Sequence, residues 1–121
     1  MPVPEHTVHY LEIVTPDVDA IRRLYEHVHG WHFQSPVPEL GNAIVAELPD
    51  GSRCGIRAPL RDTETPIMRT YLRVTDLDRA VKRAQELGAT IAIDRMELGS
   101  YGTIALYIMG GIEQGLWQLP S

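Results

Sequence analysis

The stretch VHYLEIVTPDVDAIRRLYEHVHGW, residues 8–31, contains the pattern that decides the fold. The segment that leads into it, TVHYLEIV at 7–14, alternates and is rich in β-branched and aromatic residues, which predicts a strand. A Pro-Asp pair then marks the start of a helix, with Asp17 as its N-cap. Apolar residues recur at helical spacing over 18–28, and Gly30 ends the helix. The first unit of the chain is therefore a strand followed directly by an amphipathic helix.

The same order of elements occurs again in the second half of the chain. MRTYLRV at 68–74 predicts a strand, Asp76 repeats the capping role, and Gly88 ends a second amphipathic helix. Three short strands are predicted after each helix: WHFQ, NAIVAEL and SRCGIRA in the first half, and residues 90–96, 102–109 and 113–119 in the second. Each half of the chain therefore has the order βαβββ.

The two halves align as an internal repeat. Asp17 and Asp76 lie 59 positions apart, and LPDGSRCGIRAP lies over MGGIEQGLWQLP at a shift of 61 positions. We therefore expect one domain over residues 1–121, with a first unit at about 5–58, a linker at about 58–67 and a second unit at about 68–121.

Composition and charge exclude several classes of protein. Apolar residues make up 44% of the chain and charged residues 22%, which is typical of a globular domain. The net charge is -5 without a Lys/Arg cluster, so we expect no nucleic-acid partner. The one cysteine, Cys54, excludes an intrachain disulfide framework. No apolar run approaches the roughly 18 residues of a membrane span, and the N-terminus lacks the pattern of a signal peptide. We expect a cytoplasmic protein that has no membrane partner.

Three stretches together resemble the vicinal oxygen chelate superfamily, which includes glyoxalase I, bleomycin-resistance proteins and extradiol dioxygenases. They are residues 8–31, YLRVTDLDRAVKRAQELGATI at 71–91 and GLWQ at 115–118. With the intervening strands, the resemblance covers nearly the whole chain. It implies an α+β fold of two tandem βαβββ units, whose mixed sheet curls into a cup around a cavity. The superfamily hosts lyases, dioxygenases, epimerases and plain binders, so the fold alone does not decide the function.

The resemblance also implies four metal-ligand positions that face the cavity, one on the opening strand and one on the closing strand of each unit. In this chain they are Tyr10 and Arg69, each seven residues before an Asp cap, and Gly115 with its repeat partner Cys54. Metal-dependent members place His, Glu or Gln there. Arginine has no lone pair to give and glycine has no side chain, so we expect no cofactor. A divalent metal is the alternative if this register is wrong. A slip of one residue would bring His9 into the first position but would still leave Thr70 or Met68 in the third.

The same faces predict an apolar, aromatic-lined pocket for a small-molecule ligand. The missing side chain at Gly115 is expected to leave space in it, and Arg69 to recognise an anionic or carbonyl group. His9 is expected on the opposite face of its strand, as a sheet residue. The residues expected to contact a ligand are Tyr10, Glu12, Cys54, Ile56, Arg69, Tyr71, Gly115 and Trp117.

Three functions are compatible with this pattern. The first, which we expect, is a metal-independent small-molecule-binding protein of the glyoxalase/bleomycin-resistance type. The second is an enzyme: a metal-dependent lyase, isomerase or dioxygenase, or a metal-free catalyst that uses Glu12, Tyr10 or Cys54 for proton transfer or attack. Glu12 could equally form a structural pair with Arg69. The third is an interaction module, in which the space above Gly115 would be filled. Strand edges that pairing would cover predict a homodimer.

Overall fold

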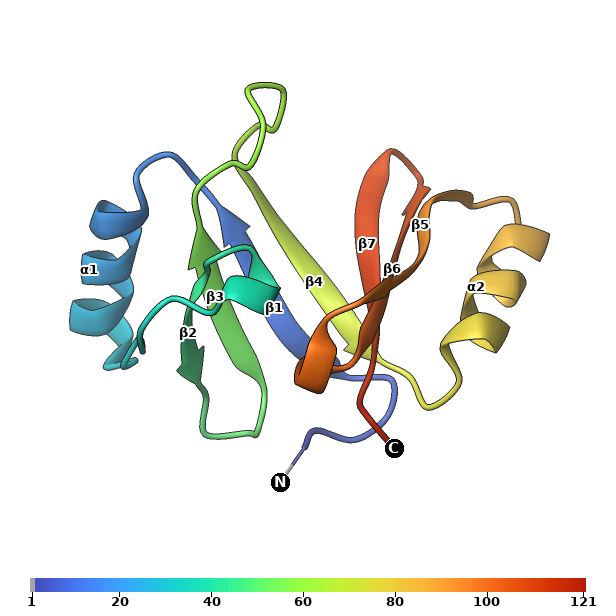
Figure 1. The fold of residues 1–121 in the computed structure, drawn as a ribbon, viewed down its shortest axis with the longest axis horizontal. Coiled ribbons are helices and arrows are strands. Elements are labelled where there is room, and N and C mark those ends of the chain that lie inside the picture. The colour runs from blue at the N-terminus through green and yellow to red at the C-terminus, as the bar shows by residue number, and fades with distance from the viewer. Residues whose placement is uncertain (1) are drawn as a thin grey trace.

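The computed structural model describes residues 2–121. Within these residues two α-helices and seven strands form, and the strands make one mixed sheet in the order β2-β3-β1-β4-β7-β6-β5. The sheet curls, and the two helices lie on its outer sides (Figure 1). The elements are β1 (Val8–Val14), α1 (Val18–His29), β2 (Ile44–Glu47), β3 (Arg53–Arg57), β4 (Ile67–Arg73), α2 (Leu77–Glu86), β5 (Thr90–Glu97), β6 (Thr103–Met109) and β7 (Ile112–Gln118), with short 3-10 turns η1 (Pro38–Leu40) and η2 (Gly99–Tyr101).

The two halves of the chain meet at the centre of the sheet, where β1 and β4 pair antiparallel. In each half the opening strand also pairs in parallel with the closing strand, β1 with β3 and β4 with β7. This shared topology confirms the predicted α+β architecture with a curled mixed sheet. One chain supplies both halves of the cup, so no second copy is needed to close it.

The first half contains one strand fewer than predicted. WHFQ at 31–34 is irregular, although the N–H of Gln34 donates to the carbonyl of Val45 at 2.9 Å. Pro36 and Pro38 follow, and proline has no N–H with which to continue a ladder. The segment therefore keeps one ladder-type hydrogen bond without forming a strand.

Both helices begin where the sequence predicts. Asp76 caps α2 by accepting from the N–H of Arg79 at 3.1 Å. Asp17 occupies the N-cap position of α1, but its side chain makes no capping hydrogen bond. Gly30 ends α1 in the left-handed conformation, with φ at 71°. Within residues 2–121 no helix has the length and hydropathy to cross a bilayer.

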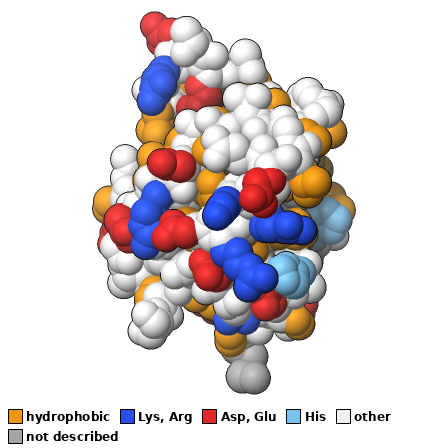
Figure 2. Space-filling view, turned by 90° about the vertical axis from the view of Figure 1, so that its right-hand side faces the viewer, with side chains coloured by type: hydrophobic (Ala, Val, Ile, Leu, Met, Phe, Trp, Pro, Cys, Tyr) orange, Lys and Arg blue, Asp and Glu red, His pale blue; other side chains and the backbone are white. Residues whose placement is uncertain are grey.

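The outer face over α2 and β5 carries charges of both signs. Figure 2 views the molecule from this side and shows Lys and Arg side chains interspersed with Asp and Glu. Arg95 on β5 pairs with Asp78 at 3.0 Å and with Glu97 at 3.3 Å. Exposed pairs of this kind contribute little to stability. The mixture also differs from the single-sign stripe that a nucleic-acid binder presents.

Three clusters of apolar side chains hold these layers together. One lies under α1 around Ile13 and Ile56, and another under α2 around Leu77 and Leu116. The third lies inside the cup, around Tyr10 and its aromatic neighbours. The helices thus bury the convex face of each half, which leaves the concave face free to form a site.

Leu77→Ala should destabilise the fold by about 2–5 kcal/mol, because it leaves a cavity under α2. Leu77 is 0% exposed, whereas Leu87 at the other end of the helix is 70% exposed. Leu87→Ala is the matched control and should change the free energy of unfolding by about 0.5 kcal/mol or less. Urea unfolding followed by circular dichroism measures both, and equal effects would contradict this packing of α2.

Candidate functional site

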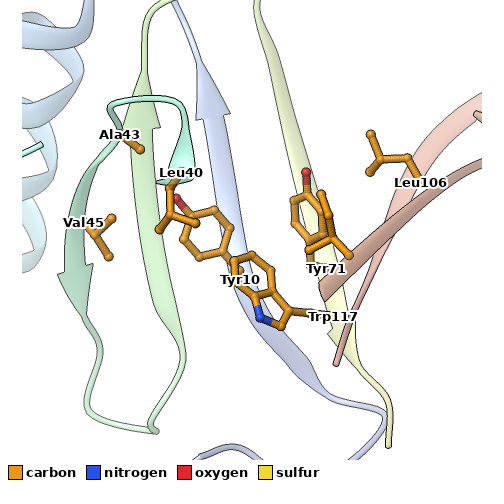
Figure 3. Close-up of a cluster of buried hydrophobic side chains, with 8 residues drawn as sticks. Tyr10, Leu40, Ala43, Val45, Tyr71, Leu106 and Trp117 are labelled. Carbon is orange, nitrogen blue, oxygen red and sulfur yellow. The ribbon is translucent and has the colours of Figure 1, made fainter. Parts of the chain in front are cut away.

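The concave face of the sheet encloses a cavity of about 380 Å³, a size that suits a small organic molecule. Its base is aromatic. Trp117 lies 4.9 Å from Tyr10 and 5.5 Å from Tyr71 between ring centroids, and the two tyrosines lie 5.9 Å apart. Figure 3 shows these three rings grouped between the central strands. Five of the residues expected to contact a ligand line this cavity: Tyr10, Glu12, Arg69, Tyr71 and Trp117.

Two glycines let the tyrosine rings lie directly against the sheet. A Cβ atom placed on Gly115 would overlap the ring of Tyr71, and one placed on Gly55 would overlap the hydroxyl of Tyr10. Neither glycine has a positive φ, so close approach and not backbone conformation requires them. The space expected above Gly115 is therefore filled by Tyr71, which is the outcome expected for an interaction module and not the one expected for a binder. A cavity is nevertheless present elsewhere in the cup.

The repeat partner of Gly115 is Gly55, so the assignment to Cys54 is wrong. Across the parallel strands, Glu12 is opposite Gly55 and Tyr71 is opposite Gly115. Glu12 and Tyr71 each lie five residues before an Asp cap, which makes them counterparts. Both closing-strand positions at which the superfamily places a metal ligand are therefore glycine in this chain.

Cys54 and Ile56 face away from the cup, contrary to expectation. Both are fully buried under α1, in a cluster with Ile13 and Phe33. Burial raises the pKa of the Cys54 thiol to about 12, so the thiol stays protonated at neutral pH. A slip of one residue in a strand moves every side chain to the opposite face, which explains both errors.

His9 also departs from its predicted place. The pairing of β1 with β4 shifts register between Val8 and Tyr10, and such an irregularity re-aims a side chain. The His9 ring lies 5.0 Å from Trp117, and His9 is only 5% exposed. Burial, with smaller contributions from the nearby positive charges of Arg53 and Arg73, lowers the pKa of His9 to about 4. The imidazole is neutral at pH 7.

His9 lines a second, wider hollow of about 890 Å³. This hollow lies beside the turn between β2 and β3, at the end of the sheet where the N- and C-termini are found (Figure 1). Its volume is larger than that of the cup, but it lacks the aromatic base and the network of buried charges described next. The cup is therefore the better candidate for a functional site.

A network of buried charges stands above the aromatic base. The Glu12 carboxylate accepts from Arg57 Nε at 2.8 Å, from the Tyr71 hydroxyl at 2.9 Å and from Arg69 Nη1. Arg69 Nη2 pairs in addition with Glu113. Glu12 is 8% exposed, so these are charge-assisted bonds away from bulk water. The predicted pair between Glu12 and Arg69 forms, within a larger network.

This network limits the acid–base chemistry that the cup offers. Both oxygens of Glu12 already accept hydrogen bonds from guanidinium groups. Burial, reinforced by the negative charge of Glu12, raises the pKa of Tyr10 and of Tyr71. The phenols are protonated at neutral pH and the carboxylate is shared between two cations. The arrangement is suited to holding a polar group more than to taking a proton.

Sequence reasoning missed four members of the site: Gly55, Arg57, Glu64 and Glu113. Arg57 shares the cup-facing parity of Gly55 on β3, and a correct register would have found both. Glu113 precedes Gly115 by two residues on β7 and shares its face. Glu64 lies in the linker between β3 and β4, where no periodic pattern indicates an orientation.

The residues at the superfamily's ligand positions do not suit a divalent metal. They are Tyr10, Gly55, Arg69 and Gly115, which together offer one protonated phenol and one cation. Among residues 2–121, no group of three or more His, Cys, Asp or Glu side chains is placed to hold a metal ion. The donor set at these positions therefore disagrees with the metal chemistry that the resemblance implies.

Glu12→Gln should destabilise the fold by about 3–5 kcal/mol, because it leaves two buried guanidinium groups without the anion between them. Glu47→Gln is the control, since Glu47 is an exposed carboxylate 3.5 Å from Arg53 and its loss should cost under about 1 kcal/mol. Urea titrations at pH 7 measure both variants. A cost for Glu12→Gln no larger than that of the control would contradict the role given to the network.

The stability that Glu64 adds should depend on pH. Its hydrogen bonds to Arg57 lower the pKa of Glu64 from 4.5 to about 2. Because the folded-state pKa is the lower one, the pair stabilises the fold fully above about pH 4.5 and loses this effect as the pH falls towards 2. The difference in unfolding free energy between the natural chain and Glu64→Gln should therefore shrink over that range. A difference that stays constant down to pH 2 would contradict the pairing.

Comparison with known proteins finds relatives that are similar to this chain in sequence and in fold. No protein-family model matches the chain. It is 25% identical over 118 residues to a Mycobacterium bovis protein named "Putative glyoxylase CFP32", an alignment that covers 93% of the chain and 45% of that protein. The chain thus spans about half the length of the curated relatives it matches.

Two solved structures share the architecture. The hypothetical protein BH1468 from Bacillus halodurans superposes with a TM-score of 0.77 at 11% identity, over 95% of each chain. Streptomyces coelicolor methylmalonyl-CoA epimerase in complex with 2-nitronate-propionyl-CoA superposes with a TM-score of 0.69 at 16% identity, over 98% of this chain and 100% of the epimerase. With the duplicated topology of the sheet, these matches show that the chain has the fold of the vicinal oxygen chelate superfamily.

Proposed function

We propose that the chain binds a small apolar or aromatic molecule in its cup and does so without a metal ion. The observation that carries this proposal is the aromatic cavity of about 380 Å³, which is bordered by a buried network of arginine and glutamate. A pocket that is mostly apolar and has a few convergent polar groups is the usual form of a small-molecule site.

The walls of the cup favour an apolar ligand. The indole N–H of Trp117 donates to the carbonyl of Tyr101 at 2.8 Å, which fixes the ring at the base of the cup, where it packs against Tyr10 and Tyr71. Aliphatic side chains from η1, from β5 and β6, and from the turn between them complete the lining: Leu40, Ile93, Met96, Leu98, Ile104 and Leu106. A flat apolar molecule would gain dispersion contacts on these surfaces.

The polar end of the cup can orient such a ligand. Arg69 is buried, and its Nε atom has no hydrogen-bond partner within residues 2–121. A buried donor without an acceptor costs free energy, so a ligand oxygen placed beside it would be bound favourably. Arg69 is thus the residue that we assign to recognition of a carbonyl oxygen of the ligand, through Nε.

Catalysis by the same cup is the second candidate. The epimerase with the same fold holds an acyl-CoA analogue, and the curated relative is named for a glyoxylase activity. In this chain the cup-facing groups able to move a proton are Glu12, Tyr10 and Tyr71, and the hydrogen bonds of Glu12 occupy both of its oxygens. Because both oxygens of Glu12 already accept hydrogen bonds, the site supports ligand binding more than acid–base catalysis.

The proposal is tested by measuring the metal content of the protein and then its binding of small molecules. Protein purified without an affinity tag is offered Zn, Ni, Mn and Fe, dialysed, and analysed for bound metal. The Trp31→Phe variant, whose one remaining tryptophan is Trp117, is then screened by fluorescence against aromatic and aliphatic small molecules, with and without a chelator. We expect no stoichiometric metal, and a ligand whose affinity the chelator does not change.

The Trp117→Phe variant is the control for location. A fluorescence response that persists there would arise from Trp31, which lies outside the cup lining. If each chain bound one metal ion tightly and the chelator abolished ligand binding, metal independence would be contradicted. Failure of every compound to bind a folded chain would contradict the binding function.

A further inference from the structure

We propose that the carboxylate of Glu64 occupies, at Arg57, the place of a carboxylate group on the ligand. Ligands of the cup would then combine a carboxylate with an apolar body, and would displace Glu64 and its linker on binding. This inference rests on the proposed function, and it names the polar group of the ligand. It follows from three properties of the Arg57–Glu64 pair, which concern its geometry, its position and its charge.

The geometry of the pair is that of carboxylate recognition. Arg57 Nη1 and Nη2 donate to the two Glu64 oxygens at 2.9 and 2.6 Å, as two parallel bonds. This bidentate fork is how arginine recognises planar carboxylates in general. The Arg57 side chain is 8% exposed and that of Glu64 is 21% exposed. The cation is therefore built into the cup, and its anion lies nearer the solvent.

The position of the pair distinguishes it from the other contacts in the network. Arg69 directs both Nη atoms to carboxylates on strands, Glu12 on β1 and Glu113 on β7. Arg57 uses Nε for Glu12 and directs its fork at a residue of the linker between β3 and β4. Glu64 can therefore leave Arg57 by movement of a loop, whereas Glu12 and Glu113 could leave only with a strand.

The linker itself is held over the cup mainly by this pair. Its hydrogen bonds within the described chain connect Leu60 to Glu64 at 2.7 Å, Glu64 to Arg61 at 3.1 Å, and Glu64 and Ala58 to Arg57. Leu60, Arg61, Thr63 and Glu64 all line the cavity. The linker projects as a loop between the ends of β3 and β4 (Figure 1). Release of Glu64 would therefore free the segment that borders the cavity.

The total charge of the network favours replacement of Glu64 by a ligand carboxylate over binding of that carboxylate beside Glu64. Arg57 and Arg69 are balanced by Glu12 and Glu113, and Glu64 adds one further negative charge. A ligand carboxylate that replaced Glu64 would keep this total. A carboxylate that bound beside Glu64 would place two like charges at one guanidinium, which low-dielectric surroundings make costly. Glu64 and an anionic ligand should therefore compete for Arg57.

The test measures 3-phenylpropionate and its uncharged amide against the natural chain, Glu64→Gln and Asp62→Asn. Asp62 is an exposed carboxylate of the same linker, so its variant removes one charge without touching Arg57. Isothermal titration calorimetry gives each affinity, and circular dichroism confirms that every variant is folded. Glu64→Gln should bind the carboxylate about tenfold more tightly, equivalent to about 1.4 kcal/mol. Asp62→Asn should stay within about twofold of the natural chain, as should the amide in all three proteins.

The outcomes separate this inference from the function on which it rests. Equal affinity of the natural chain and Glu64→Gln for 3-phenylpropionate, with the amide still bound, overturns the inference and leaves the proposed function standing. An equal gain in Asp62→Asn assigns the effect to the general charge of the linker and also overturns it. Failure of both probes to bind any of the three proteins overturns the proposed function and this inference together.

Discussion

The carboxylate of Glu12 lies between the guanidinium groups of Arg57 and Arg69, and the rest of the cup depends on this contact. Two buried cations on the strands that flank β1 would repel each other, and each would lack the hydration it has in water. One carboxylate on the strand between them satisfies both and also accepts from the Tyr71 hydroxyl. It ties together β3, β1 and β4, across the junction of the two halves, and leaves the fork of Arg57 directed at the linker.

Below this network, two aromatic rings lie against two glycines. The closing strand of each half has a glycine at the position where the resemblance implies a metal ligand, and a tyrosine covers it: Tyr10 at Gly55 and Tyr71 at Gly115. The two tyrosines are not repeat counterparts, because Tyr10 aligns with Arg69 and Glu12 aligns with Tyr71. The two halves therefore build the base of the cup with different residues on the same curled sheet.

The sequence predicted the duplication, both helices and most of the strands, because their periodic patterns and caps are local signals. It placed Cys54 and Ile56 wrongly because the repeats align at a shift of 60 at Gly55 and not 61, and one residue reverses a strand. The shifted register beside His9 has no signature in the pattern of residues. Glu64 could not be found because a linker has no periodicity, and its partner is set by tertiary structure alone.

We propose that side chains of this chain, and not a metal ion, organise the cup. The most direct measurement is a crystal structure of protein soaked in nickel, with anomalous diffraction recorded at the nickel absorption edge. We expect no anomalous peak in the cup, with the Tyr10 and Tyr71 rings against their glycines and Glu12 between its two arginines. A nickel ion bound among these strands, with either ring displaced, would contradict it.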